Sequence, residues 1–425
     1  MQNLYSDLSR CQLIEEQAKI LKLFNECKAK KLNLNMMRGV QSPEQLDLSN
    51  EMLNIDLKDY KSKDGDIRNY GGLAGTSESR ELFRDLVGAE SVDEIIVGGN
   101  ASLSLMHNAV MRGMLFGVCG SEPWSKSNAK FLCPVPGYDR HFAICELFGV
   151  EMININLTSE GPDMDEVERL VKDPSVKGIW CVPRYSNPNG VTYSEAVVKR
   201  FANLEPAAAD FRIYWDNAYI EHHLTETGDN LLDLFAELKK NNKEDMLYMF
   251  LSASKITFPG AAVAAICASV KNIKDILSKM FVQTIGPDKI NQARHVLFLK
   301  NAAGIKAHLQ KHRLILAPKF KTVLNGLEKN LNGLASWSKP NGGYFISLVV
   351  PENCAKRTVE LAKELGVILT PAGATYPYGK DPRDENIRIA PTFPTVAELE
   401  QAVEALCVCV KMAYLEKLIK AGGKK

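Results

Sequence analysis

Lys255 is the first residue of this 425-residue sequence that we single out for its chemistry. It closes the segment Ser252-Ala253-Ser254-Lys255, which follows the apolar run 247–251 and precedes Gly260-Ala261-Ala262. Small and apolar neighbours of this kind desolvate an amine, lower its pKa and make the neutral form available as a nucleophile. A single lysine normally faces solvent, so this role depends on the other residues that reach the same place.

Asp216 is the second candidate, because it ends the apolar segment Arg212-Ile213-Tyr214-Trp215 and is followed three residues later by Tyr219. A carboxylate buried without a partner destabilises a protein by several kcal/mol. A pyridinium N–H would be a suitable partner for it. A helix cap explains the residue equally well when this segment is considered alone.

Three further turns carry glycine, polar or aromatic residues directly after a predicted strand. Gly98-Gly99-Asn100-Ala101-Ser102 opens a helix, whose free backbone N–H groups and positive end would suit a phosphate. Pro136-Gly137-Tyr138 places an aromatic ring at the end of another strand, although such a ring more often only packs. Asn187-Pro188-Asn189-Gly190 consists of turn residues and would by default be a surface turn.

Strand and helix patterns alternate from about residue 79 onward. This alternation predicts an α/β protein with a mainly parallel sheet that helices cover on both faces. Ligands bind such sheets beyond the carboxyl ends of the strands, which is where the five candidate segments lie. The predicted strands are 95–97, 130–133, 150–155, 177–182, 212–215, 247–251 and 263–268, and the predicted helices include 101–116 and 140–148.

A smaller α+β domain is predicted from the C-terminal third of the chain together with the N-terminal segment. A long helical region follows residue 300, and then come a strand at 342–348, a helix at 356–365 and a short strand at 367–369. Ile14, Ala18, Leu21 and Phe24 are spaced for one face of a helix that packs on the body. We therefore expect a large domain at 52–312 and a small domain formed by 1–51 and 313–425, ending in a loose tail from Ala421.

Composition and charge argue against several other classes of protein. Hydrophobic residues make up 45% and charged residues 24%, as in ordinary globular proteins, and the formal net charge of +1 gives no reason to expect a nucleic-acid partner. The ten cysteines lack the spacing of a disulfide framework or a zinc site, so we expect reduced thiols, no metal and a cytoplasmic location. We find neither a signal-peptide pattern nor an apolar run suited to a membrane span, so we expect no membrane partner.

The order of the motifs resembles that of the fold-type-I pyridoxal-phosphate aminotransferases of class I. The matching segments are Gly99-Asn100-Ala101-Ser102, Tyr138, Asn187-Pro188-Asn189-Gly190, Asp216 with Tyr219, Ser252 to Lys255, Gly342-Gly343-Tyr344-Phe345 and Arg388-Ile389-Ala390. Tyr138-Asp139-Arg140-His141-Phe142, Gly161 to Asp165 and Gln283 to Lys289 look like an atypical aspartate aminotransferase subgroup. The likeness extends from about Arg38 to Pro394.

The resemblance implies a pyridoxal 5′-phosphate cofactor and a role for each residue around it. Lys255 would hold the cofactor as a Schiff base and later move a proton between the substrate Cα and the cofactor C4′. Asp216 would keep the ring nitrogen protonated, so that the ring can accept the carbanion electrons. The other contacts would be hydrogen bonds from Asn187 and Tyr219 to the ring oxygen, stacking of Tyr138, and phosphate contacts from Asn100, Ala101, Ser102 and Ser252.

Contacts to the substrate and to a second subunit follow from the same resemblance. Arg388 would bind the α-carboxylate through a two-donor fork that lysine cannot reproduce, with Asn187 beside it. Tyr70 would reach the phosphate of the neighbouring subunit, which implies a homodimer with shared active sites. Typical members carry a phosphate-binding arginine where this chain has Val263, so other donors such as Lys289 or the start of its helix must contribute.

The function that the resemblance favours is an aminotransferase with aspartate or glutamate as amino donor and 2-oxoglutarate or oxaloacetate as oxo acid. The distal carboxylate of such a donor needs a second cation. The candidates are Arg38 beside Gly39, Lys289, Arg184 and Arg294, of which Arg38 and Lys289 are preferred. If these cations are solvated instead, the pocket would suit alanine or aromatic donors. Three other functions stay open, namely a carbon–sulfur lyase or decarboxylase with the same cofactor, a regulator that senses the cofactor or an amino acid, and an inactive scaffold.

Overall fold

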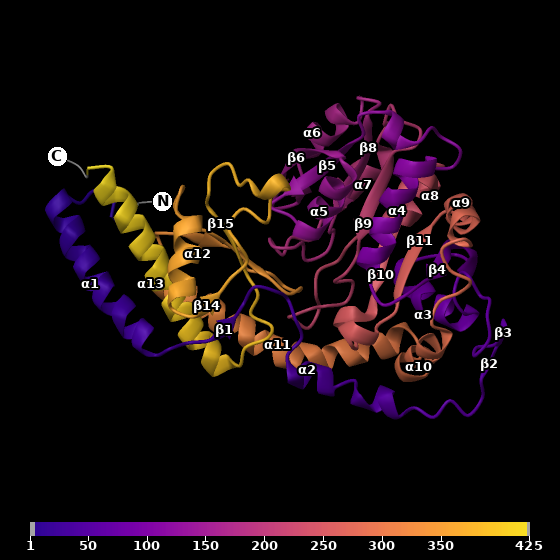
Figure 1. Cartoon of the computed structure of the whole chain (residues 1–425), viewed down its shortest axis with the longest axis horizontal. Coiled ribbons are helices and arrows are strands. Elements are labelled where there is room, and N and C mark those ends of the chain that lie inside the picture. Colours follow the sequence, from indigo (N-terminus) through magenta and orange to yellow (C-terminus); the bar gives the residue numbers. More distant parts are fainter. Residues whose placement is uncertain (1–4, 423–425) are drawn as a thin grey trace.

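The computed structural model describes residues 5–422 and consists of a large and a small part that lie side by side (Figure 1). Residues 423–425 of the expected tail lie outside the described residues. α11 (Ala302–Leu331) runs along the bottom of the view under both parts. The predicted limit between residues 312 and 313 falls inside this helix, so the domain limits stay a prediction.

An eight-stranded sheet forms the centre of the large part, in the order β4-β11-β10-β9-β8-β5-β6-β7. β11 and β7 are antiparallel to their neighbours, whereas the other strands run parallel to one another. The predicted α/β class with a mainly parallel sheet is therefore confirmed. The strands are β4 (Ile95–Val97), β5 (Lys130–Val135), β6 (Glu151–Thr158), β7 (Gly161–Pro162), β8 (Val176–Cys181), β9 (Arg212–Asp216), β10 (Leu247–Ser252) and β11 (Ala264–Ala268).

Hydrophobic clusters cover both faces of this sheet, because successive side chains of a strand point to opposite faces. In β9, Ile213 and Trp215 belong to one cluster and Tyr214 to the other. The first cluster includes residues of α3 (Ser77–Val87), α6 (Met164–Leu170), α7 (Glu195–Asn203) and α8 (Leu234–Lys240). The second includes residues of α4 (Ser102–Phe116), α5 (Asp139–Phe148) and α9 (Val270–Met280). β10 from 247 to 251 and β11 are buried on both faces and apolar, whereas β9 is apolar only between Arg212 and Asp216.

The small part combines a three-stranded antiparallel sheet with packed helices. Its strands are β12 (Ser336–Trp337), β13 (Ile346–Val349) and β15 (Asn386–Ile389), and β1 (Leu34–Asn35) pairs in parallel with β14 (Val367–Ile368). The helices are α1 (Arg10–Ala29), α12 (Ala355–Glu364) and α13 (Val396–Lys420). Along the chain, α2 (Pro43–Asp47) and the hairpin of β2 (Lys61–Ser62) and β3 (Gly65–Asp66) come between β1 and α3, and the hairpin lies at the far end of the large part (Figure 1).

The N-terminal helix α1 packs against α13, but with a face other than the predicted one (Figure 1). Its buried residues are Leu13, Ile20, Phe24 and Cys27, whereas Ile14 and Leu21 are 49% and 48% exposed. Both sets have helical spacing and share Phe24, so the position of α13 decides which stripe is covered. The expectation that this segment packs on the body is confirmed, and the expected face is wrong.

Among the described residues, no helix is long and apolar enough to cross a bilayer.

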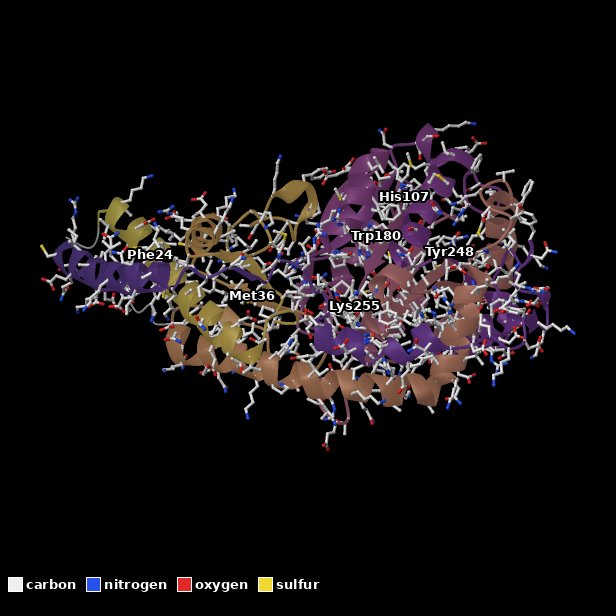
Figure 2. The ribbon with its side chains drawn as sticks, turned by 60° about the horizontal axis from the view of Figure 1, so that its bottom comes forward. Phe24, Met36, His107, Trp180, Tyr248 and Lys255 are labelled. Atoms are coloured by element: carbon white, nitrogen blue, oxygen red, sulfur yellow. The ribbon has the colours of Figure 1, made fainter. Side chains whose placement is uncertain are left out.

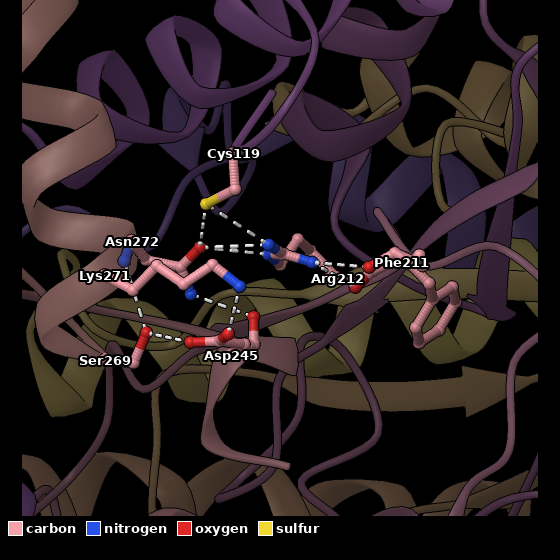
Figure 3. A network of polar contacts seen from close by, with 8 residues as sticks. Cys119, Phe211, Arg212, Asp245, Ser269, Lys271 and Asn272 are labelled. Carbon is pink, nitrogen blue, oxygen red and sulfur yellow. Dashed lines mark hydrogen bonds and ion pairs between the residues drawn. The ribbon is translucent and has the colours of Figure 1, made fainter. Parts of the chain in front are cut away.

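A polar network, buried at Arg212 and Asn272 and exposed at Lys271, holds the start of β9 (Figure 3). The Arg212 guanidinium donates to the Phe211 carbonyl at 2.9 Å and to Asn272 Oδ1 at 3.0 Å. The Asn272 amide in turn donates to the Asp245 carbonyl at 2.8 Å, and the Lys271 ammonium donates to the Asp245 carboxylate at 2.8 Å. The network joins β9 to α9 at the end of the strand opposite Asp216.

Candidate functional site

A cavity of about 480 Å³ lies where the two parts meet, at the carboxyl ends of the parallel strands. Figure 2 shows Lys255 close to this junction. Residues from the N-terminal segment and from the small part complete the walls. Of the predicted site residues, those that line the cavity are Lys255, Asp216, Tyr219, Ser102, Tyr138, Asn187, Arg388, Arg38 and Gly39.

Lys255 lies on the short 3₁₀ turn Ala253–Lys255 that directly follows β10. Burial lowers the pKa of its amine, and the negative charge of Asp216 partly opposes this effect. The Nζ atom lies 4.9 Å from the centre of the Tyr219 ring. An amine with a lowered pKa that faces a cavity can react as a nucleophile.

Asp216 is the last residue of β9 and is only 3% exposed. Its Oδ2 atom lies 3.1 Å from Nε2 of His141, whose ring stacks on Trp180. Its Oδ1 atom is buried and has no hydrogen-bond partner among the described residues. Because an unpartnered buried carboxylate oxygen is costly, a donor from a bound group would complete the site. A protonated ring nitrogen fits this requirement.

His141 was not among the residues predicted from the sequence. It lies in the first turn of α5, three residues after Tyr138, and its ring is 2% exposed. Its contact with Asp216 joins residues 75 positions apart. The Tyr-Asp-Arg-His-Phe motif contained the residue, but spacing alone offered no reason to pair it with Asp216.

The start of α4 lies near the Lys255 turn and has no side-chain cap. Its N-cap residue is Ala101, so the first backbone N–H groups of the helix are available to a ligand. Ser102 lines the cavity, whereas Asn100 and Ser252 do not. The Ser254 hydroxyl donates to the Asn100 carbonyl at 3.0 Å, which ties this turn to the Lys255 turn. Val263 is buried in the large hydrophobic core and adds no charge here.

Two tyrosines, Tyr138 and Tyr219, line the cavity together with Lys255 and Asp216. Burial and the negative charge of Asp216 raise the pKa of Tyr138 to about 12. Burial also raises the pKa of Tyr219 well above its ordinary value. Both hydroxyl groups therefore stay protonated at neutral pH and can donate hydrogen bonds.

Arg388 comes from β15 of the small part and is 5% exposed. Its guanidinium donates to Asp139 Oδ1 at 2.8 Å and to Asn187 Oδ1 at 3.3 Å. Its other edge donates to the Thr370 hydroxyl at 3.2 Å, and it stacks on Phe345. Neither Asp139 nor Thr370 was predicted. Asp139 meets Arg388 only when the small part packs on the large part, whereas Thr370 lies in the small part itself, 18 positions before Arg388.

Lys289 and Tyr70 lie at a separate cavity that is lined by residues 67–71 and 284–290. The Lys289 ammonium donates to the carbonyls of Asn69 at 2.6 Å and Gly71 at 2.7 Å, while Tyr70 between them is 83% exposed. Arg184, in turn, donates to the Ile220 carbonyl. Arg140, which we did not predict, lines the Lys255 cavity together with Arg38.

A family model for aspartate aminotransferases matches residues 8–422 of the chain. The chain belongs to this family. An aspartate aminotransferase of Corynebacterium glutamicum is 44% identical to our aminotransferase over 416 residues, which are 96% of each chain. The crystal structure of an aspartate transaminase from C. glutamicum matches it with a TM-score of 0.93 at 42% identity, covering 97% of this chain and 100% of the other.

A more distant neighbour is the α-aminoadipate aminotransferase LysN of Thermus thermophilus, solved with N-(5′-phosphopyridoxyl)-L-leucine. It matches with a TM-score of 0.75 at 19% identity over 92% of this chain and 95% of its own, which shows the fold alone. The predicted fold type I and the predicted aminotransferase class are confirmed by the family and its close relatives. Of the functions left open by the sequence, the comparisons support the aminotransferase.

Proposed function

We propose that this aminotransferase carries pyridoxal 5′-phosphate on Lys255 and transfers the amino group of aspartate or glutamate to a 2-oxo acid such as 2-oxoglutarate. The observation that carries the proposal is the unpartnered Oδ1 atom of Asp216, buried in the same cavity as the Lys255 amine. This carboxylate oxygen can only accept a hydrogen bond, so the group that binds beside it must be a donor. The names of the two C. glutamicum relatives support the substrate class.

The residues around the cavity suit each part of the cofactor. The start of α4 with Asn100, Ala101 and Ser102, and Ser252 nearby, would hold the phosphate. Tyr138 would stack on the ring, Asp216 would accept from its nitrogen, and the ring oxygen would take hydrogen bonds from Asn187 and Tyr219. When bound, the protonated ring supplies a sink for the electron pair that remains when the substrate Cα loses its proton.

Three side chains would act on the substrate. Arg388 would bind the α-carboxylate and so direct the Cα–H bond toward Lys255, which lines the same cavity. The Lys255 amine, whose pKa is lowered by burial, would take the proton from the substrate Cα and deliver it toward C4′ of the bound cofactor. Tyr219, whose ring packs beside Nζ, limits the positions that the amine can adopt.

The distal carboxylate of aspartate or glutamate would bind at the mouth of the cavity. Arg38 and Arg140 line this mouth, and neither forms an ion pair among residues 5–422. Lys289, the other preferred candidate, has its ammonium engaged by the Asn69 and Gly71 carbonyls. We therefore propose that Arg38 or Arg140 binds the distal carboxylate. Lys289 would instead hold the loop around Tyr70 through its two backbone contacts.

A homodimer is part of the proposal. Tyr70 is 83% exposed, and Phe281, Val282 and Ile285 are 64%, 78% and 61% exposed. An apolar surface of this kind suits a protein partner. Tyr70 would cross to the phosphate of the neighbouring subunit. A cytoplasmic location is also proposed, since all ten cysteines are free thiols.

The test is chemical labelling of the purified protein loaded with pyridoxal phosphate. Borohydride should fix the cofactor to the peptide that contains Lys255, as read by mass spectrometry. Lys255→Ala should abolish both the label and transamination, whereas Lys306→Ala, which changes an exposed lysine outside the cavity, should leave both intact. Label on another lysine, or turnover by Lys255→Ala at the wild-type rate, would overturn the proposal.

A further inference from the structure

The Arg388 guanidinium, which is proposed to bind the substrate α-carboxylate, already forms an ion pair within the protein. The Arg388 guanidinium donates to Asp139 Oδ1 at 2.8 Å inside the Lys255 cavity. The Arg388 side chain is 5% exposed and that of Asp139 is 31% exposed. The arginine is thus buried, while its carboxylate partner is partly exposed.

Every edge of the Arg388 guanidinium has a partner in this state. Nη1 donates to Asp139 and to Asn187, and Nε and Nη2 donate to the Thr370 hydroxyl. A substrate carboxylate binds an arginine best through two parallel N–H donors. Among these acceptors, Asp139 is the only carboxylate. It therefore offers Arg388 the same kind of negatively charged oxygen as a substrate carboxylate. A substrate must therefore displace it or share a donor with it.

The remaining partners can hold the guanidinium without Asp139. The Thr370 hydroxyl is itself fixed, because it donates to the Met37 carbonyl at 2.7 Å. The centre of the Phe345 ring lies 4.9 Å from the Arg388 guanidinium carbon, and this contact limits the tilt of the guanidinium. Asp139 is the first residue of α5, so the positive end of that helix stabilises its carboxylate after release. Asp139 is thus a group that can leave and return.

We propose that Asp139 is a specificity-determining residue that competes with substrate for Arg388 and so sets the affinity for carboxylate ligands. This inference rests on the proposed function of Arg388. The apparent dissociation constant of a ligand rises in inverse proportion to the fraction of protein in which its site is free. If Asp139 holds Arg388 in nine molecules of ten, a ligand binds about tenfold more weakly than to an unpaired arginine.

The test is calorimetric titration of the pyridoxal-phosphate-loaded protein with succinate, a dicarboxylate that has no amino or oxo group and cannot react. We expect Asp139→Asn to lower the dissociation constant about tenfold, because the neutral amide competes weakly. The same variant should have a lower melting temperature without ligand, because buried Arg388 loses its counter-charge. Asp165→Asn is the matched control, since it removes one negative charge from the first turn of α6, outside the cavity.

A higher succinate dissociation constant for Asp139→Asn than for wild type would overturn the inference. If Asp139 only positioned Arg388, Asp139→Asn would bind succinate more weakly than wild type, and an unchanged constant would exclude competition as well. Arg388→Ala separates this result from a failure of the proposed function. Succinate binding that survives Arg388→Ala would contradict the carboxylate role of Arg388 itself. Binding that is lost in Arg388→Ala and is not tightened in Asp139→Asn would contradict the competition alone.

Discussion

At the scale of single residues, choice of the amino donor should depend on the arginines at the mouth of the cavity. Arg388 can bind the α-carboxylate of any amino acid and therefore does not distinguish aspartate from alanine. Arg38 and Arg140 line the same cavity and form no ion pair among the described residues, so a second carboxylate could bind them. Both side chains are exposed, so a bound substrate must exclude water from the pair before its loss weakens binding by about 2–5 kcal/mol, the value for a desolvated charge pair.

We expect Arg38→Ala or Arg140→Ala to lower kcat/KM for aspartate and glutamate by tens to about a thousandfold and to leave kcat/KM for alanine nearly unchanged. Lys289→Ala is the comparison, and its ratio of aspartate to alanine should equal that of wild type because its ammonium binds backbone carbonyls. The measurement is steady-state kinetics with the three donors and phenylalanine. A wild-type enzyme that prefers alanine or phenylalanine would contradict the acidic substrate class.

At the scale of elements, β9 carries a buried charged residue at each end, and the two have different tasks. Asp216 at the carboxyl end has an oxygen without a partner and lines the cavity. Arg212 at the amino end is 2% exposed, donates to Asn272 and Phe211, and lies outside the cavity. Complete hydrogen bonding indicates a structural role for Arg212, whereas the missing partner of Asp216 indicates a binding role.

Arg212→Met should therefore lower the free energy of unfolding by about 1–3 kcal/mol, because buried acceptors on Asn272 and Phe211 lose their donor. Turnover per folded molecule should not change. Urea denaturation measures the first quantity and kinetics the second. Arg200→Met is the control, because it breaks ion pairs of a guanidinium that is 40% exposed and should change stability by less than about 1 kcal/mol. A loss of cofactor affinity in Arg212→Met would contradict this division of roles.

At the scale of the whole molecule, α11 joins the two parts through buried histidines. His308 lies 2.9 Å from the Ile256 carbonyl of the large part and 3.1 Å from the Ser49 hydroxyl of the N-terminal segment. One turn later, His312 lies 3.1 Å from the Gln45 amide nitrogen. Burial lowers the pKa of His312 from 6.5 to about 3. This histidine is therefore neutral in the folded protein at pH values where the unfolded chain would protonate it.

The sign of the pH dependence follows from this difference. Below pH 6.5 the unfolded chain binds a proton that folded His312 does not, so the free energy of unfolding falls as the pH decreases toward about 3. The slope is about 1.4 kcal/mol per pH unit for each such histidine. His312→Gln should reduce the slope between pH 4 and 6 by about this amount, as measured by urea denaturation. If the free energy of unfolding depends on pH with the same slope in His312→Gln and in wild type, the prediction is contradicted.

The amino-acid sequence determined the order of strands and helices in the large part and the positions of Lys255 and Asp216 at strand ends. Apolar runs and helical spacing act over a few residues, so the strands expected at 95–97, 212–215 and 247–251 agree closely with β4, β9 and β10. Parallel strands then bring their carboxyl ends to one edge of the sheet. The likeness of the motifs to known aminotransferases identified the family, which no periodicity could have done.

Only the tertiary structure decided which side chains are partners. Asp139 and Arg388 are 249 positions apart, and they meet because the small part packs over the start of α5. Lys289 was predicted as a substrate ligand from the sequence, and the structure gives its ammonium two backbone partners, the Asn69 and Gly71 carbonyls, that spacing could not reveal. A side chain's nearest acceptor depends on how distant elements pack, and spacing along the chain does not contain that information.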